Sequence, residues 1–325
     1  MTPNHALITG GAGFIGSHLC ELLLDKGWRV TVLDDLSTGS IDNIRHLEKN
    51  EKFRVYVGSA SDKDQLKSLC VDVDTLFHLA AVVGVRKVME NTVETIERNL
   101  HTTEVVLQIC NLFRLRVLTA STSEVYGANV KDKFSEEDNA VIGASRHRRW
   151  CYAAGKLLDE FHAYAYYHAT NLPMTIVRLF NTIGPRQVGH YGMVVPTFVR
   201  QALLNEPITV HGNGLQSRCF TDVRDVVKCL YALAVCNDAI GQVFNIGSQN
   251  EISMLQLAEK IKTMTDSSSE IVFKSYDEVY GEDFVDLDRR VPDTTRLAGA
   301  IGFEPETPLD VILQSVIDNI RINKE

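Results

Sequence analysis

The stretch Ala6-Leu7-Ile8-Thr9-Gly10-Gly11-Ala12-Gly13-Phe14-Ile15-Gly16 decides the fold class of this 325-residue chain. Its first four residues are apolar or β-branched, as in a short buried strand, and the glycines after them allow a tight turn. Apolar residues then recur at helical spacing as far as Gly27. Strand, glycine turn and helix in this order predict a phosphate-binding unit. In such a unit, backbone N–H groups and the positive end of a helix dipole face a pyrophosphate.

The next strand supplies a candidate ribose ligand. Residues 28–33 form an apolar run that ends at Asp34, roughly twenty residues after the first glycine, where dinucleotide-binding units carry an acidic residue. Its carboxylate would accept hydrogen bonds from an adenosine ribose; the alternative is a simple turn residue. Asp35 follows it, and no arginine stands nearby in the sequence to neutralise a 2′-phosphate. NAD is therefore favoured over NADP.

Strands and helices continue to alternate through the first half of the chain. Residues 53–57 alternate as a strand, and residues 75–81 form a buried strand that ends in small side chains, which leave room for a cofactor. Residues 91–112 read as a long amphipathic helix, in which Asn99 is a candidate brace for a neighbouring strand. His78 is expected to be a core histidine rather than a catalyst. The alternation predicts an α/β fold with a doubly wound parallel sheet, a Rossmann fold.

The second half of the chain is less regular. Residues 128–149 form a long polar connection, and a connection of this length inside a domain is usually functional. Regular alternation stops after the strand at 174–180. We therefore predict an NAD-binding domain at 1–180 and a smaller substrate-binding part at 181–325, with a strand near 243–247 that may return to the sheet.

Tyr152 and Lys156 form the candidate base. Four residues apart on a helix, they share one face, so the ammonium can approach the phenol. A free tyrosine has a pKa of about 10. We expect Lys156, together with a cationic nicotinamide ring, to lower the pKa of Tyr152. Thr122, at the end of a strand, would hold the substrate hydroxyl that Tyr152 deprotonates. The Tyr-x-x-x-Lys pair alone is weak evidence and gains its force from the glycine turn.

Composition narrows the classes of partner. The formal net charge of -9 argues against a nucleic acid or an anionic membrane, because both require a basic surface. The start of the chain lacks the pattern of a secretory signal, and no apolar run is long enough to span a bilayer, so we expect a cytoplasmic protein. The seven cysteines show neither metal-ligand spacing nor a disulfide framework, and no metal site is predicted.

Several motifs in a fixed order resemble the extended short-chain dehydrogenase/reductases of the nucleotide-sugar epimerase/dehydratase family. They are the segments 9–16, 78–81, 121–127, 152–156, 178–186, 216–223 and 290–293, with Asp34 and Asn99. The resemblance implies tightly held NAD, a UDP- or dTDP-sugar bound under the C-terminal part, and a homodimer formed through the two long helices. One departure is Ser59, where many relatives carry an aspartate near the adenine.

The resemblance also assigns roles to individual residues. The catalytic set is Thr122, Ser123, Glu124, Tyr152 and Lys156. The cofactor-binding residues are Gly10, Gly13, Phe14, Ile15, Gly16, Asp34, Ser59, Ala60, Leu79, Ala80, Ala81 and Asn99, together with Tyr152 and Lys156. The substrate-binding residues are Asn181, Arg186, Val195, His211, Arg218 and Arg290.

The pair Ser123-Glu124 bears on the reaction. Sugar 4,6-dehydratases use an Asp-Glu pair here as acid and base, and a serine removes the acid, so dehydration is disfavoured. The form Thr-Ser-Glu-Val-Tyr-Gly, followed later by Arg149-Trp150-Cys151-Tyr152, resembles UDP-glucuronate decarboxylases. Decarboxylation to UDP-xylose or its 4-keto intermediate is the leading hypothesis, and Arg290 is a candidate anion ligand.

Two alternatives stay open. UDP-hexose or UDP-uronate 4-epimerisation is the second hypothesis, because residues 181–187 also resemble epimerases. A non-catalytic NAD-sensing protein is the third, although such proteins tend to lose the catalytic tyrosine or lysine, and both are present here.

Overall fold

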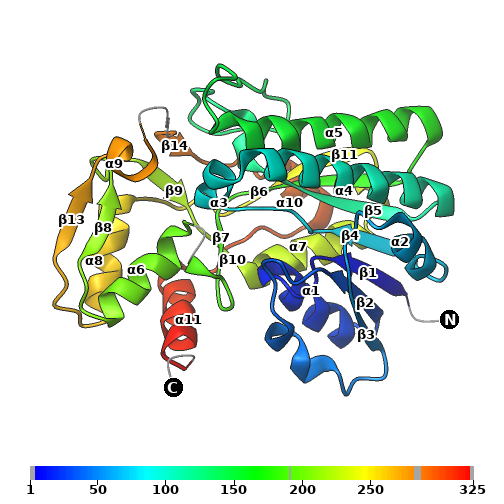
Figure 1. The fold of residues 1–325 in the computed structure, drawn as a ribbon, viewed down its shortest axis with the longest axis horizontal. Helices are drawn as coiled ribbons and strands as arrows, with labels where there is room; N and C mark the ends of the chain where they lie inside the picture. Colours follow the sequence, from blue (N-terminus) through cyan, green and yellow to red (C-terminus); the bar gives the residue numbers. More distant parts are fainter. Residues whose placement is uncertain (1–3, 190–191, 282–286, 323–325) are drawn as a thin grey trace.

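A seven-stranded sheet, in which every neighbouring pair of strands is parallel, runs through the larger part of the computed structural model (Figure 1). The model describes residues 4–189, 192–281 and 287–322. The strands are β1 (His5–Thr9), β2 (Arg29–Asp34), β3 (Phe53–Val57), β4 (Thr75–His78), β5 (Arg116–Thr122), β6 (Met174–Leu179) and β11 (Gln242–Ile246). Their order is β11-β6-β5-β4-β1-β2-β3. The order reverses between β1 and β4, so the carboxyl ends of these two strands border the crevice in which doubly wound sheets bind ligands. The predicted fold class is confirmed.

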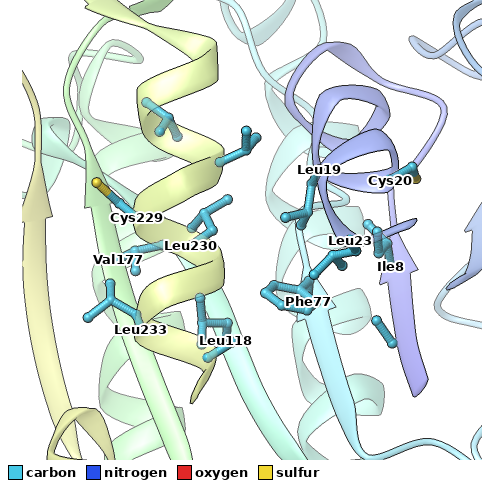
Figure 2. Packing of buried hydrophobic residues seen from close by; sticks show 14 of the residues in the cluster. Ile8, Leu19, Cys20, Leu23, Phe77, Leu118, Val177, Cys229, Leu230 and Leu233 are labelled. Atoms are coloured by element: carbon cyan, nitrogen blue, oxygen red, sulfur yellow. The ribbon is translucent and has the colours of Figure 1, made fainter. Parts of the chain in front are cut away.

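Helices cover both faces of this sheet. The helices are α1 (Phe14–Asp25), α7 (Val223–Val235) and α10 (Thr295–Ile301) on one face, and α2 (Lys63–Leu69), α4 (Thr92–Phe113) and α5 (Trp150–Thr170) on the other. Alternate residues of β1 serve the two faces, since Ile8 packs under α1 and Leu7 under α4. Figure 2 shows Leu23 of α1 and Leu230 of α7 over the first of these faces. Each such buried leucine contributes about 1.5–3 kcal/mol.

The strand expected near 243–247 is β11, and it pairs in parallel with β6, from Gln242 opposite Thr175 to Ile246 opposite Leu179. The chain reaches β11 through α7, which packs against the same sheet. Residues 223–246 therefore belong by packing to the larger part, and a single cut at residue 180 does not follow the packing. The reason is that β6 would be the edge strand of the sheet without β11, and an unpaired edge can take up a later strand of the chain.

The smaller part has a core of its own. Its main helices are α6 (Val194–Leu203), α8 (Met254–Met264) and α11 (Leu309–Ile322). Its strands are β7 (Thr182–Ile183) with β10 (Thr221–Asp222), β8 (Ile208–His211) with β13 (Ile271–Lys274), and β9 (Ser217–Cys219) between β12 (Glu251–Ser253) and β14 (Arg289–Arg290). A short helix of this part is α9 (Tyr276–Tyr280). The short elements of the larger part are helix α3 (Val85–Glu90) and the 3-10 turns η1 (Ile41–Asn43), η2 (Arg45–Leu47), η3 (Ser123–Tyr126) and η5 (Asn237–Ala239). Val199, Leu257 and Ile312 meet in this second core.

His78 is a core residue, as expected. Its ring nitrogens lie 2.8 Å from the Thr9 hydroxyl and 3.2 Å from the Thr103 hydroxyl. Burial first, and then the positive charge of Lys156, lower the pKa of His78 to about 3. A histidine that is neutral at physiological pH and bonded on both sides holds β1, β4 and α4 together rather than exchanging protons with a substrate.

Among the described residues, no helix combines the length and the apolar character needed to cross a membrane.

Candidate active site

A cavity of about 1190 Å³ lies at the carboxyl ends of the sheet, between the two parts of the molecule. Ligand pockets more often measure about 300–1,000 Å³, so this one has room for more than one small molecule. It is lined by every residue that the sequence analysis assigned to catalysis or to the cofactor, and by all the predicted substrate residues except Arg186. Tertiary structure therefore brings together motifs that lie as much as 280 residues apart, from Gly10 to Arg290.

The glycine turn forms a close-fitting floor for one end of this cavity. Gly10 has φ +75°, and a side chain there would meet the Ala80 backbone nitrogen at 2.8 Å. A side chain at Gly16 would lie 2.2 Å from the Gly10 carbonyl oxygen. Helix α1 begins after Gly13, whose position offers no side-chain acceptor, so N–H groups of the first turn are left for an anion. This cradle fits the diphosphate of a dinucleotide.

Asp34 is held in place at the rim of the same region. Its two carboxylate oxygens accept hydrogen bonds from Ala12 N–H (2.9 Å) and Leu36 N–H (2.8 Å), and it remains part of the cavity lining. Burial raises the pKa of Asp34, while the backbone donors oppose that change. Ser59 also lines this end, with its hydroxyl 2.7 Å from that of Ser61. Asp34 and Ser59 thus place hydrogen-bonding groups at this end of the cavity, where the sequence predicts the ribose and the adenine of the cofactor.

An arginine stands beside Asp35, contrary to the sequence expectation. Arg98 reaches across from α4, forms an ion pair with Asp35, and donates to Glu94 Oε1 at 3.0 Å. The two residues are 63 positions apart in the sequence, which is why reading the neighbours of Asp35 along the chain did not find the pair. Arg98 is thus already bound by two carboxylates.

Asn99 braces the end of β4, as the sequence analysis suggested. Its side-chain oxygen accepts from Val82 N–H at 2.7 Å, and its amide nitrogen donates to the Val82 carbonyl oxygen at 3.2 Å. This two-point contact fixes α4 against the backbone segment that borders the cavity, and so fixes Arg98 as well.

The Tyr-x-x-x-Lys pair lies in α5 and faces the cavity together with Thr122. The Lys156 ammonium donates to Asp159 Oδ2 at 2.9 Å, and both side chains are almost fully buried. The Thr122 hydroxyl accepts from Glu124 N–H at 3.2 Å and so caps the turn η3. The expected catalytic residues therefore come together, with Asp159 as a partner that the sequence analysis missed. Its signal was its position three residues after Lys156 on the same helix face.

Within the protein itself, the pKa of Tyr152 is raised, whereas the expected lowering also counted a cationic nicotinamide ring. Burial raises it well above its ordinary value, the carboxylates of Glu124 and Asp159 raise it further, and Arg149 opposes them. The expectation counted the charge of Lys156 but not that of Asp159, which neutralises the ammonium. Lowering the pKa of this phenol within the protein therefore requires additional positive charge from a bound ligand.

Asp159→Asn tests this balance. Removing the carboxylate takes away a group that raises the Tyr152 pKa and leaves the Lys156 charge uncompensated, so the pKa should fall. Because the base is active when deprotonated, the rising limb of kcat/KM against pH should move to lower pH by about one unit. Tyrosinate absorbance measured against pH gives a second readout. A rising limb at the wild-type position, or one moved to higher pH, would contradict this account.

Glu124 is clamped by two arginines. Arg149 and Arg290 both form ion pairs with its carboxylate, and Arg290 Nη1 also lies 3.3 Å from the Ser123 hydroxyl. Burial alone would raise the pKa of Glu124, but the two guanidinium groups outweigh it and hold the pKa well below its usual range. Glu124 is therefore ionised at any physiological pH and has no proton to donate. Within this group of three buried side chains, two guanidinium charges stand against one carboxylate charge, and Tyr152 lies close enough to be affected by Glu124 and Arg149.

Arg218 lies next to this cluster. Strand β14 pairs in parallel with β9, with Arg290 opposite Arg218, and both arginines line the cavity. The smaller part thus presents two guanidinium groups, the side chain suited to bidentate contacts with carboxylates and phosphates. Arg149 was not among the predicted site residues. The motif Arg149-Trp150-Cys151-Tyr152 was the available signal, because it places Arg149 at the start of α5.

Arg186 corrects a prediction. It lies outside the cavity lining and binds α1, donating to Glu21 Oε1 at 2.5 Å and to the Ser17 hydroxyl at 3.2 Å. Its backbone has φ +70°, in the left-handed region. The motif that ends in Arg186 therefore attaches the smaller part to the first helix of the larger one.

The other predicted substrate residues line the smaller part's side of the cavity. Asn181 donates to the Cys219 carbonyl oxygen at 3.0 Å, and Val195 is fully buried in α6. The His211 ring meets Tyr280 edge to face, with 5.5 Å between the ring centroids. Aromatic residues of α9 thus border this end of the cavity, and they were not found from the sequence.

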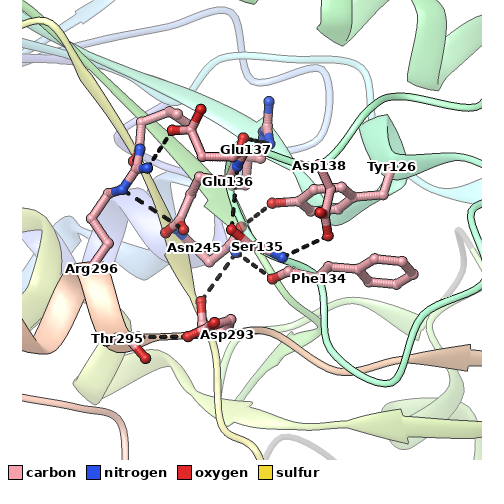
Figure 3. Close-up of polar contacts among 12 residues, drawn as sticks. Tyr126, Phe134, Ser135, Glu136, Glu137, Asp138, Asn245, Asp293, Thr295 and Arg296 are labelled. Atoms are coloured by element: carbon pink, nitrogen blue, oxygen red, sulfur yellow. Dashed lines mark hydrogen bonds and ion pairs between the residues drawn. The ribbon is translucent and has the colours of Figure 1, made fainter.

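The polar connection at 128–149 contacts β11 and the segment after Arg290, and Figure 3 shows Phe134, Asn245 and Asp293 in these contacts. Phe134 pairs with the segment after Arg290, accepting from Asp293 N–H and donating to the Val291 carbonyl oxygen, both at 2.8 Å. Asn245 of β11 donates to the Phe134 carbonyl oxygen at 2.8 Å. Arg290 is therefore anchored to the edge of the large sheet through this connection.

Comparison with known proteins agrees with this geometry. The family model described as GDP-mannose 4,6 dehydratase matches residues 7–316. The chain belongs to this family. The extended short-chain dehydrogenase/reductase resemblance predicted from the motifs is thereby confirmed. The match spans both parts of the molecule. The similarity to the family therefore includes the smaller part as well as the Rossmann fold.

Three relatives place this family member more closely. It is 40% identical over 316 residues to UDP-N-acetyl-alpha-D-glucosaminuronate decarboxylase of Bacillus cytotoxicus, with 97% of each chain covered. It is 36% identical to UDP-glucuronic acid decarboxylase 1 of Xenopus tropicalis, over 97% of this chain and 72% of that one. Among solved structures, UDP-glucuronic acid 4-epimerase from Bacillus cereus, in complex with UDP-glucuronic acid and NAD, superposes with a TM-score of 0.89 at 27% identity, covering 98% of this chain and 99% of that one.

Proposed function

We propose that this chain is an NAD-dependent decarboxylase of a UDP-linked hexuronate, with UDP-glucuronate as the reference substrate and UDP-xylose or its 4-keto intermediate as product. The observation that carries this proposal is the buried cluster of Arg149, Glu124 and Arg290 beside Tyr152. Its excess positive charge can bind a carboxylate that arrives with the sugar. A neutral hydroxymethyl group at the same place would not need it.

The state of Glu124 supports decarboxylation over dehydration. Expelling the 6-hydroxyl of a hexose as water requires a proton donor, and Glu124 is held ionised while position 123 is a serine. Loss of carbon dioxide requires no such donor, because the carboxylate leaves with its carbon and the electron pair of the broken bond moves to the neighbouring ketone. The cluster is thus better suited to a reaction in which the substrate loses its carboxylate as carbon dioxide and keeps the electron pair as an enolate.

The residues of the chain would act in a simple order. Thr122 would hold the 4-hydroxyl, and Tyr152 would take its proton. Bound NAD would accept the hydride from carbon 4 and later return it. Arg290 and Arg149 would steady the substrate carboxylate until the bond between carbons 5 and 6 breaks, after which carbon 5 takes up a proton. Glu124 would keep the two guanidinium groups in place throughout. The glycine turn and Asp34 would hold the diphosphate and ribose of the cofactor.

A product assay tests this proposal. The purified chain, supplied with NAD, is incubated separately with UDP-glucuronate, UDP-N-acetylglucosaminuronate, UDP-glucose and dTDP-glucose, and the products are identified by mass spectrometry. Release of carbon dioxide from a UDP-uronate is the expected result. No carbon dioxide from either uronate would overturn the proposal. The N-acetylated substrate is included because the Bacillus cytotoxicus relative is named for it.

Epimerisation at carbon 4 is the second candidate. Tyr152, Lys156 and the cofactor cradle serve it equally well, and the structure of the Bacillus cereus UDP-glucuronic acid 4-epimerase superposes over nearly the whole chain. The same incubation separates the two reactions, since an epimerase would return an isomer of unchanged mass. Conversion of UDP-glucose to UDP-galactose would favour the hexose form of this alternative.

We also propose a homodimer formed through α4 and α5, in the cytoplasm as expected from composition. The groove between these helices is lined by Leu100, Leu158 and Phe161 among polar residues, and Phe161 and Leu158 are more than half exposed. Apolar side chains of this size on adjoining helices are suited to a second copy of the same face.

Phe161→Glu should therefore yield a monomer. A carboxylate at the centre of a two-fold interface would face its own copy and lose its water. Sedimentation equilibrium of wild type and variant measures the effect, and Val130→Glu, which changes an almost fully exposed residue outside these helices, is the control. A monomeric wild type would refute the dimer.

A further inference from the structure

We propose that Asp35 makes this chain selective for an adenine dinucleotide with a free 2′-hydroxyl by occupying Arg98, a guanidinium that would otherwise bind a 2′-phosphate. The inference rests on the dinucleotide part of the proposed function and is independent of the sugar reaction. It assigns a role to an ion pair that the family motifs do not include.

The ion pair lies at the ribose end of the cavity. Asp34, Asp35 and Arg98 all line it, together with Ser37 and Thr38 of the loop after β2. A 2′-phosphate on a ribose held by Asp34 would enter the space bordered by the next residue, Asp35. The Arg98 side chain is 37% exposed, so its guanidinium is accessible to a ligand in the cavity.

Both partners of the pair are fixed from outside. Asp35 Oδ1 accepts from Ser37 N–H at 2.9 Å, and Arg98 Nη1 donates to Glu94 Oε1 at 3.0 Å. Asn99, the next residue, ties α4 to the Val82 backbone. The guanidinium therefore stays near the ribose end whether or not Asp35 is charged.

Charge decides which dinucleotide this end accepts. The carboxylates of Asp35 and Glu94 pair with the one guanidinium of Arg98, and Asp34 adds a third carboxylate to the same end of the cavity, so the local charge is negative. A phosphate monoester carries a charge of about −1.5 to −2 at pH 7 and would be repelled. Without the Asp35 carboxylate, Arg98 retains only Glu94 as a partner. It can then offer part of its donor set to a phosphate, for which the planar guanidinium is well suited.

The test measures binding rather than turnover. Protein freed of copurified dinucleotide is titrated calorimetrically with NADH and with NADPH, for wild type, Asp35→Ser, Arg98→Ala and the double variant. Asp42→Asn is the matched control, because it removes one carboxylate from the same loop region, where Asp42 pairs with Arg45 instead. Asp35→Asn provides a second substitution should the serine variant fold poorly.

The expected result is a rise of at least about tenfold in the NADPH affinity relative to NADH in Asp35→Ser, the size of one charge-assisted hydrogen bond. The double variant should lose this rise, and Asp42→Asn should match wild type. A wild-type ratio in both Asp35 variants would overturn the inference. An equal rise in the double variant would also overturn it, because charge removal alone would then suffice. Wild-type protein that binds neither dinucleotide would instead refute the proposed function.

Discussion

Tyr152→Phe is expected to lower kcat by at least about a thousandfold, which is within the range that a positioned acid-base group contributes. The substitution removes only the hydroxyl from a side chain that lines the cavity together with Thr122 and Lys156. No other described tyrosine lines this part of the cavity, because Tyr276 and Tyr280 lie in α9 at the far end. The rate of carbon dioxide release from a UDP-uronate measures this loss of turnover.

Cofactor binding should survive in the same variant. The glycine turn and Asp34 are unchanged, so the affinity for NADH should stay within a few-fold of wild type. Tyr164→Phe is the matched control. Tyr164 lies on the same helix, α5, but packs against the hydrophobic core between α5 and the sheet. Near-normal turnover in Tyr152→Phe, or an equal loss in Tyr164→Phe, would remove Tyr152 from the chemistry.

Arg290→Met should abolish most of the decarboxylation while leaving the cofactor site intact. The substitution keeps an unbranched apolar stem and removes one of the two guanidinium groups bound to the buried Glu124. Losing a hydrogen bond to a charged group costs about 1.5–3 kcal/mol, and a loss of transition-state binding of that size would lower kcat/KM about 10- to 150-fold. The remaining charges, those of Glu124 and Arg149, would cancel and leave no excess to hold a substrate carboxylate.

The neighbouring residue supplies the control. Arg289 is exposed and pairs with Glu251 and Asp132 away from the cavity, so Arg289→Met should change kcat/KM by no more than about twofold. Thermal unfolding of both variants separates a loss of function from a loss of fold. Carbon dioxide release at the wild-type rate by Arg290→Met would refute the role of the arginine cluster.

Much of the nucleotide half could be predicted from the sequence because its signals are local. The glycine turn, the spacing to Asp34 and the alternation of strands with helices follow from the backbone geometry of a few residues at a time. Asn99 and His78 were also predicted correctly, since each interrupts a regular pattern where a polar group must find a buried partner.

The pKa values and ion pairs of the site could not be predicted in the same way, because they depend on residues that are distant in the sequence. The sequence placed Tyr152 and Lys156 on one helix face, but it did not show that burial and the carboxylates of Glu124 and Asp159 raise the pKa of Tyr152 within the protein itself. It offered Arg186 as a substrate ligand, whereas the fold attaches that arginine to Glu21.

By itself, then, the sequence determined the fold class and the family motifs, and it predicted cofactor residues that line one cavity, since these features depend on short-range spacing. Only the tertiary structure decided which charges neutralise one another. Arg98 reaches Asp35, and Arg149 and Arg290 reach Glu124, from distant parts of the chain. The electrostatic energy of a group depends on its distance to other charges and on its burial, and the folded chain sets both quantities for these pairs.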